Sequence, residues 1–332
     1  MDHTPAAKDL APDDDAHEHG RGRHAEKPSD VPPKGWLDIL SRTKDQLAED
    51  NLSIVAAGVA FYAFLAVVPA LGALIGIYAL VADAGQISDH ISALARVVPG
   101  EVMPLLEDQL KRITSDEKAA GWSAALGLFL AIYSSSAATK ALIKGINIAY
   151  DENEKRGFFK LNLVALGLTL FILVGAVIAV GLVAILPEVL EHLQISTKAE
   201  TLLSWLRWPV LLIGFMVGLS AFYRSGPSRE NPKWKWVSWG AGTAALLWLA
   251  GSALFSLYVV KLGAYDKTYG SLGAVVVFLL WLFITAYTVL IGAELNSEME
   301  RQTVRDTTEG PEKPLGSRGA QAADTVGPSR KK

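Results

Sequence analysis

The chain has 332 residues, of which 51% are apolar and 20% are charged, and its formal net charge is −3. It contains no cysteine, which excludes disulfides, iron–sulfur clusters and thiolate zinc sites. Its near-neutral charge also excludes nucleic-acid binding driven by the charge of the whole chain. The apolar residues are gathered in long runs without charges, a distribution typical of an all-α, polytopic membrane protein.

Both ends of the chain are polar. Residues 1–34 and 301–332 contain few large apolar side chains, which predicts that they are disordered. After the first of these tails, Trp36, Leu40 and Leu47 recur near helical spacing among charged residues. This pattern predicts an amphipathic helix over residues 35–49 that lies on the membrane surface.

Residues 35–300 are expected to form one membrane domain, because their apolar runs approach or exceed the ~20 residues that a helix needs to cross a ~30 Å hydrocarbon core. The runs predict a bundle of six transmembrane helices, at about residues 53–81, 120–140, 161–187, 203–223, 237–260 and 268–293. After the first span, two apolar helix faces separated by Pro99-Gly100 predict an external helical hairpin at residues 86–118.

The basic residues predict the orientation of this bundle. Residues 140–160 contain five Lys or Arg, and residues 224–235 contain four. Loops rich in these residues stay in the cytoplasm, so both loops are expected there. With six spans, the N and C termini are then both cytoplasmic.

Motifs that would indicate catalysis are weak. Residues 240–245 match the dinucleotide pattern G-x-G-x-x-A, but they lie at the start of a membrane span and not after a strand. Small residues here, and Gly214 with Gly218 in the fourth span, predict close helix packing instead. No His and carboxylate ligands converge in the spans, so we expect no catalytic residue, no metal and no cofactor. The chain is not expected to be an enzyme.

Polar residues gather where the second, third and sixth spans end. The candidate functional residues of this group are Lys140, Lys144, Asn147, Tyr150, Arg156, Glu294 and Asn296. If all these ends are cytoplasmic, they form one polar ring, in which Glu294 pairs with Lys140, Lys144 or Arg156. The alternative is that the basic residues only set the topology and contact anionic headgroups.

A second candidate is the start of the sixth span. Tyr269, Gly270 and Gly273 stand there, and the two glycines relax the restriction on the backbone. They predict a flexible external hinge. The alternative is a helix start that packs against a neighbour.

Three groups of residues recur in the order and spacing of a known family. They are Asn51-Leu52, Ala56-Ala57-Gly58, Phe61-Tyr62 and Pro69; then Asn147, Tyr150 and Glu154; then Tyr269-Gly270-Ser271-Leu272-Gly273, Trp281 and Gly292-Ala293-Glu294-Leu295-Asn296. Over about residues 36–300 the chain resembles the YihY/BrkB family. The resemblance implies a six-helix protein of the bacterial inner membrane. Family members carry the labels "virulence factor BrkB" and "ribonuclease BN"; the residues of this chain give no support to ribonuclease activity.

The expected function is transport or flipping of a lipid or other amphipathic molecule in the cell envelope, because the predicted spans have no ionisable residue in their middle. The alternative is a non-transporting membrane scaffold for envelope assembly or stress resistance. The expected partners are the lipid bilayer and a lipid-like substrate, and not nucleic acid. Close packing at Gly292 permits an oligomer without requiring one.

Overall fold

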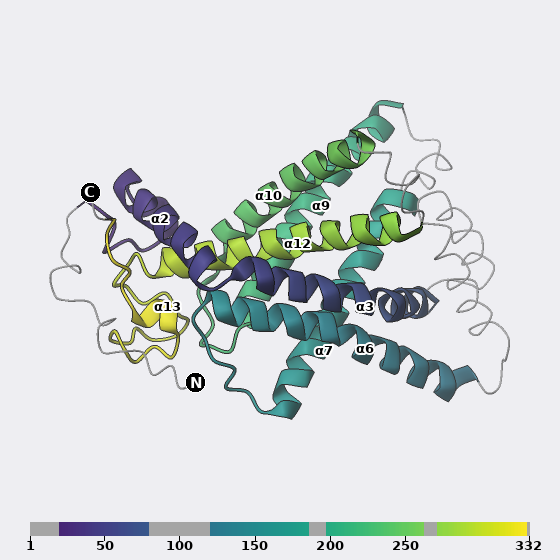
Figure 1. Ribbon diagram of the computed structural model, residues 1–332, viewed down its shortest axis with the longest axis horizontal. Coiled ribbons are helices and arrows are strands. Elements are labelled where there is room, and N and C mark those ends of the chain that lie inside the picture. Colours follow the sequence, from purple (N-terminus) through teal and green to yellow (C-terminus); the bar gives the residue numbers. More distant parts are fainter. Residues whose placement is uncertain (1–19, 80–119, 186–196, 262–270, 331–332) are drawn as a thin grey trace. The chain divides into compact units, whose positions relative to one another are not determined.

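A computed structural model describes residues 20–79, 120–185, 197–261 and 271–330 of the chain (Figure 1). Most of the described residues are helical, and the rest form loops and turns, with one isolated bridge between Pro232 and Thr308. The long helices are α2 (Pro33–Glu49), α3 (Leu52–Ala79), α6 (Ala120–Ala149), α7 (Phe158–Val180), α9 (Thr197–Ser225), α10 (Trp234–Lys261) and α12 (Ser271–Glu300). Shorter elements are η1 (Pro28–Asp30), η2 (Gly181–Ile185) and α13 (Gln321–Asp324).

Six of these helices are long and apolar enough to cross a membrane, which confirms the predicted number. Their apolar segments are Leu52–Leu74, Ala125–Ala149, Phe158–Val183, Trp205–Ser225, Trp234–Val259 and Gly273–Glu300. The second and sixth helices continue past their predicted ends at residues 140 and 293, because lysines and glutamates end an apolar run without ending a helix. The predicted hairpin at residues 86–118 lies outside the described residues, as do Tyr269 and Gly270.

The chain divides into two compact units. The first contains Met1–Phe61, Ala141–Phe158 and Ile213–Lys332, and the second contains Tyr62–Lys140 and Phe159–Leu212. In the second unit, the hydroxyl groups of Thr139 and Thr169 lie 2.7 Å apart, and they join α6 to α7. The hydroxyls of Ser135 and Ser136 bond to carbonyls of the preceding turn of α6.

Helices α10 and α12 of the first unit approach backbone to backbone. A methyl group added to Gly240 would overlap the carbonyl oxygen of Gly292, and one added to Gly292 would lie 2.5 Å from the hydroxyl of Tyr223. Asn296 reinforces the contact, because its Oδ1 accepts from the backbone N–H of Gly240 at 2.8 Å. Gly240 therefore serves helix packing, as predicted, and Gly292 takes part in the same contact within the chain. Gly214 differs, since no described atom lies within 4 Å of its added methyl group.

The predicted amphipathic helix is present as α2, and its packed face combines charged side chains with Ile39 and Trp36, which contact a hydrophobic cluster that includes Trp236. Leu37 and Leu40 are 54% and 53% exposed, whereas Asp38, Ile39 and Arg42 are buried. Arg21 donates to both oxygens of Asp38, at 2.6 and 2.7 Å. Ion pairs and hydrogen bonds, together with Ile39, therefore attach α2 to the rest of the first unit.

The described parts of both tails are folded, which differs from the disorder expected from their composition. The C-terminal segment, residues 301–330, is organised around Arg318. Its guanidinium donates to the carbonyls of Val304, Arg305, Lys313 and Ala323. Asp324 accepts from the backbone N–H groups of Arg318 and Gly319. Hydrogen bonds from side chain to backbone thus replace the large apolar side chains that the composition lacks.

Candidate functional site

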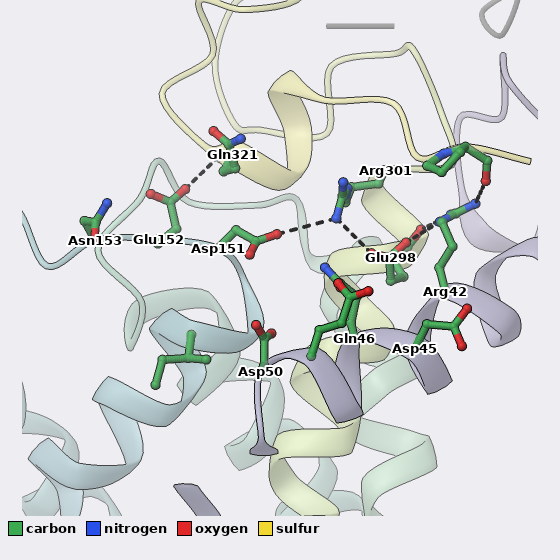
Figure 2. Close-up of a pocket in the computed structure, with 13 residues that line it drawn as sticks. Arg42, Asp45, Gln46, Asp50, Asp151, Glu152, Asn153, Glu298, Arg301 and Gln321 are labelled. Atoms are coloured by element: carbon green, nitrogen blue, oxygen red, sulfur yellow. Dashed lines mark hydrogen bonds and ion pairs between the residues drawn. The ribbon is translucent and has the colours of Figure 1, made fainter. Parts of the chain in front are cut away.

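A cavity of about 880 Å³ opens in the first unit, where three helices end (Figure 2). It is lined from α2, from the residues after α6, from the end of α12 and from the C-terminal segment. The lining residues are Arg42, Asp45, Gln46, Glu49, Asp50, Ile148, Asp151, Glu152, Asn153, Glu298, Arg301, Gln321 and Pro328. We call this cavity the polar pocket.

Two tight turns lie next to the polar pocket. Asn51, between α2 and α3, has a φ of 51°, and Asp151, just after α6, has a φ of 54°. Asn and Asp are the non-glycine residues that adopt this left-handed conformation most readily. Each turn ends a helix abruptly, and so leaves Asp50 and Asp151 at the rim of the pocket.

The lining of the polar pocket is acidic. Six carboxylates face two guanidinium groups: Asp45, Glu49, Asp50, Asp151, Glu152 and Glu298 against Arg42 and Arg301. Both arginines are already engaged with carboxylates of the pocket. The pocket therefore favours a positively charged or zwitterionic ligand group over an anion.

Glu298 is held between the two arginines (Figure 2). Arg42 pairs with its carboxylate and also donates to Gln302 Oε1 at 2.9 Å and to the carbonyl of Pro328 at 3.0 Å. Arg301 lies 3.0 Å from Glu298 and 3.4 Å from Asp151. These contacts tie α2, α12, the turn after α6 and the C-terminal segment into one wall.

Asp50 titrates unusually. Its own burial and the nearby carboxylates of Asp151 and Glu49 raise its pKa to about 6, and Arg301 offsets only part of this effect. Asp50 is thus a side chain of the polar pocket that changes charge near pH 6.

Glu152 connects the polar pocket to the C-terminal segment. Its carboxylate accepts from the backbone N–H of Gln321 at 2.7 Å and from Lys155 at 2.9 Å. The C-terminal segment is therefore part of the pocket and not an appendage beside it.

Several of the predicted polar residues form a network behind the pocket. Asn147 donates to Glu154 at 3.1 Å and accepts from the backbone N–H of Ser228 at 2.8 Å. Arg156 holds both oxygens of Glu154 at 2.7 Å. Burial alone would raise the pKa of Glu154, but the hydrogen bonds from Arg156 and Asn147 lower it to about 2.

Tyr150 belongs to a second buried group. The guanidinium of Arg229 lies 4.8 Å from the centre of the Tyr150 ring and makes two bonds to Glu300, at 3.0 and 2.7 Å. Burial alone would lower the pKa of Arg229, but Glu300 raises it above its usual value, so the guanidinium stays charged. Thr307 donates to the same carboxylate at 2.6 Å. This group joins the α9–α10 loop, α12 and the C-terminal segment.

The residues of the predicted polar ring have partners other than those expected. Asn147, Tyr150, Arg156, Glu294 and Asn296 all belong to the first unit, but Arg156 pairs with Glu154 rather than with Glu294. Lys144 is exposed. Lys140 belongs to the second unit, where it donates to Asn162 at 3.1 Å.

Glu294 and Gly273 occupy opposite ends of α12. They are 21 positions apart on this helix, which is about 31 Å at 1.5 Å per residue. Gly273, the one residue of the predicted hinge that the structure describes, is therefore remote from the polar pocket.

None of the residues that line the polar pocket is among the candidates predicted from the sequence. Glu298 follows Glu294 by four positions on one face of α12, and Arg301 follows by seven, just past the end of the helix. This spacing was available as a signal, but it is visible only when the helix is continued past its apolar run. The pairing of Arg42 with Glu298 joins residues 256 positions apart and leaves no local pattern.

Comparison with known protein families matches residues 43–316 to the family described as Virulence factor BrkB. The chain is 26% identical over 218 residues to the ribonuclease-like protein YfkH of Bacillus subtilis, an overlap of 64% of this chain and 78% of that protein. It is 26% identical over 264 residues to a UPF0761 membrane protein of Vibrio parahaemolyticus, with 77% and 80% of the two chains covered. A UPF0761 membrane protein of Vibrio cholerae is 27% identical over 274 residues, with 79% and 87% covered. No solved structure matches the chain.

Proposed function

Because the chain belongs to the Virulence factor BrkB family of bacterial membrane proteins, we propose that it moves a lipid or other amphipathic molecule across the inner membrane. The observation that carries this proposal is the polar pocket at the end of apolar helices. Its lining residues lie at or just beyond the ends of three apolar segments, at Leu52, Ala149 and Glu300. A molecule with one polar and one apolar end can place its polar end there while its apolar end stays among membrane-facing side chains.

The size and charge of the polar pocket support a lipid headgroup that carries an amine. About 880 Å³ lies within the range of small-molecule sites, roughly 300–1,000 Å³. The excess of carboxylates attracts an ammonium group, while Arg42 and Arg301 stand near enough to the same lining to meet a phosphate. A zwitterionic headgroup is therefore favoured over a purely anionic one.

We also propose that the protein acts without catalysis. The name of the Bacillus subtilis relative describes that protein as ribonuclease-like. In this chain, six carboxylates line the polar pocket, and they repel the phosphates of RNA.

The density of basic residues after the second and fourth spans supports cytoplasmic termini, which place the pocket on the cytoplasmic side.

Lipid exchange in proteoliposomes tests the proposal. Full-length protein is reconstituted with headgroup-labelled phospholipids, and a membrane-impermeant quencher reports their movement between leaflets. Asp45→Asn with Glu49→Gln neutralises two exposed carboxylates of the polar pocket, whereas Glu26→Gln with Glu312→Gln neutralises two exposed carboxylates elsewhere. We expect the first double variant to slow the exchange of an amine-headed lipid at least several-fold and the second to leave it unchanged.

Two outcomes would count against the proposal. Equal exchange by both double variants would remove the polar pocket from the transport path. Absence of protein-dependent exchange for amine-headed, zwitterionic and anionic lipids alike would favour the scaffold, and capture of envelope proteins on the immobilised chain would then be the next measurement.

A further inference from the structure

Glu294 is a buried carboxyl group on α12, one helical turn from Glu298 of the polar pocket. Glu294 is 1% exposed, and its Oε2 has no hydrogen-bond partner among the described residues. Buried polar atoms in folded proteins are nearly always hydrogen-bonded, so an unpartnered carboxyl oxygen requires an explanation. An ionisable residue within a membrane span is in addition usually functional.

The charges around Glu294 do not compensate a negative charge. Three carboxylates act on it, from Glu298 on the same helix, from Asp50 before α3 and from Asp151 after α6. Arg301 is a cation among the described residues that acts on it, and this arginine already pairs with Glu298 and Asp151. The buried hydroxyl of Tyr150 is a further titratable neighbour among the described residues.

An ionised carboxylate in these surroundings would be costly. It would lose its water, gain no hydrogen bond at Oε2 and face more negative than positive charge. A protonated carboxyl avoids both the desolvation of a charge and the repulsion by its neighbours. The state that fits the geometry is therefore the neutral acid.

We propose that Glu294 is a proton-binding site of the membrane domain, which holds a proton at neutral pH and exchanges it through the polar pocket. The path is short, because Glu298 lies one turn along α12 and lines the pocket together with Asp50. The ligand of the site is the proton itself. The inference goes beyond the proposed transport and does not depend on it, because its readout is the charge of one side chain.

Infrared spectroscopy of the full-length protein in lipid nanodiscs tests this site. At pH 7 we expect the C=O band of a buried, protonated carboxylic acid in the wild type, and loss of that band in Glu294→Gln. The matched control Glu312→Gln, which alters an exposed glutamate outside the pocket, should keep the band. An identical band in all three proteins, or its absence from the wild type, would overturn the inference.

Thermal unfolding provides a second readout. Gln is a neutral analogue of protonated Glu, so Glu294→Gln should keep the unfolding midpoint of the wild type at neutral pH. As the pH rises and the proton leaves, the wild type should lose stability relative to the variant. A large loss of stability in Glu294→Gln at pH 7 would show that the negative charge is needed, and would contradict the proton site. Neither readout measures lipid exchange, so a failure here is distinct from a failure of the transport proposal.

Discussion

Asp50 shows how a single side chain can give the polar pocket a response to pH. Its usual pKa is 3.8, and burial with the neighbouring carboxylates of Asp151 and Glu49 raises it to about 6. In the folded protein Asp50 therefore holds its proton over a range in which the unfolded chain has released it. Folding is favoured by this proton below pH 3.8, and the advantage is lost as the pH rises to about 6.

Asp50→Asn is expected to remove this dependence. Asn stays neutral, so the variant should match the wild type near pH 4 and become more stable than it above pH 6. We expect a difference of about 1 kcal/mol, less than the full conversion of ~1.4 kcal/mol per pKa unit, because solvent screens this partly exposed group. Unfolding midpoints of both proteins from pH 4 to pH 8 measure the effect. Parallel curves would show that Asp50 has an ordinary pKa.

At the scale of elements, the contact between α10 and α12 depends on two glycines. Gly292→Ala would place a methyl group 2.5 Å from the hydroxyl of Tyr223 and 2.6 Å from the carbonyl of Gly240. Overpacking of this kind costs about 1–3 kcal/mol, and here the obstacle includes backbone that cannot rotate away. We expect Gly292→Ala to lower the unfolding midpoint.

Gly214→Ala is the matched control for that variant. It changes the same residue type within the apolar segment of α9, but the added methyl group meets no described atom within 4 Å. It should leave the unfolding midpoint in place. If Gly214→Ala destabilises the protein as much as Gly292→Ala, the side of α9 that carries Gly214 is covered by something other than the described residues.

The sequence was sufficient to predict these helices, but it was insufficient to predict the contacts that the side chains make at the helix ends. Long apolar runs report the transfer of side chains into lipid, so six spans could be predicted without knowledge of any contact. The packing of Gly240 was also predictable, because small residues indicate close backbones. The pairing of Arg156 with Glu154, and not with Glu294, could not be predicted. It depends on the turn after α6 and on the carbonyl of Gly226, to which Arg156 donates at 2.8 Å.

The C-terminal segment was mispredicted for a related reason. Composition measures how much apolar surface a segment can bury, and residues 301–330 have little of it. The segment is instead ordered by Arg318, which bonds four of its carbonyls, and by Glu152 and Arg42, which attach it to the helices. Bonds of this kind depend on geometry that amino-acid frequencies do not contain.

At the scale of the whole molecule, Arg42 connects the beginning of the membrane domain with its end. It reaches Glu298 and Gln302 at the end of α12 and Pro328 in the C-terminal segment. Arg42→Ala would leave the buried carboxylate of Glu298 with Arg301 as its remaining guanidinium partner among the described residues. Removal of one member of a buried pair costs about 3 kcal/mol or more.

We therefore expect Arg42→Ala to lower the unfolding midpoint and to make the C-terminal segment more sensitive to limited proteolysis. Lys44→Ala, which removes an exposed cation from the same helix, is the control and should change neither. Undiminished protection of residues 301–330 in Arg42→Ala would mean that Glu152 and the other contacts hold the segment alone.

The length of chain that separates Arg42 from its partners has a consequence for biosynthesis. Arg42 leaves the ribosome 256 residues ahead of Glu298, an interval of about 13–50 s at roughly 5–20 residues per second. Throughout this time α2 has none of its final ion-pair partners on α12, while the intervening spans are inserted one after another. The polar pocket is thus among the last parts of the protein to form, and a nascent chain that stalls before α12 is complete carries the helices of a membrane protein without its site.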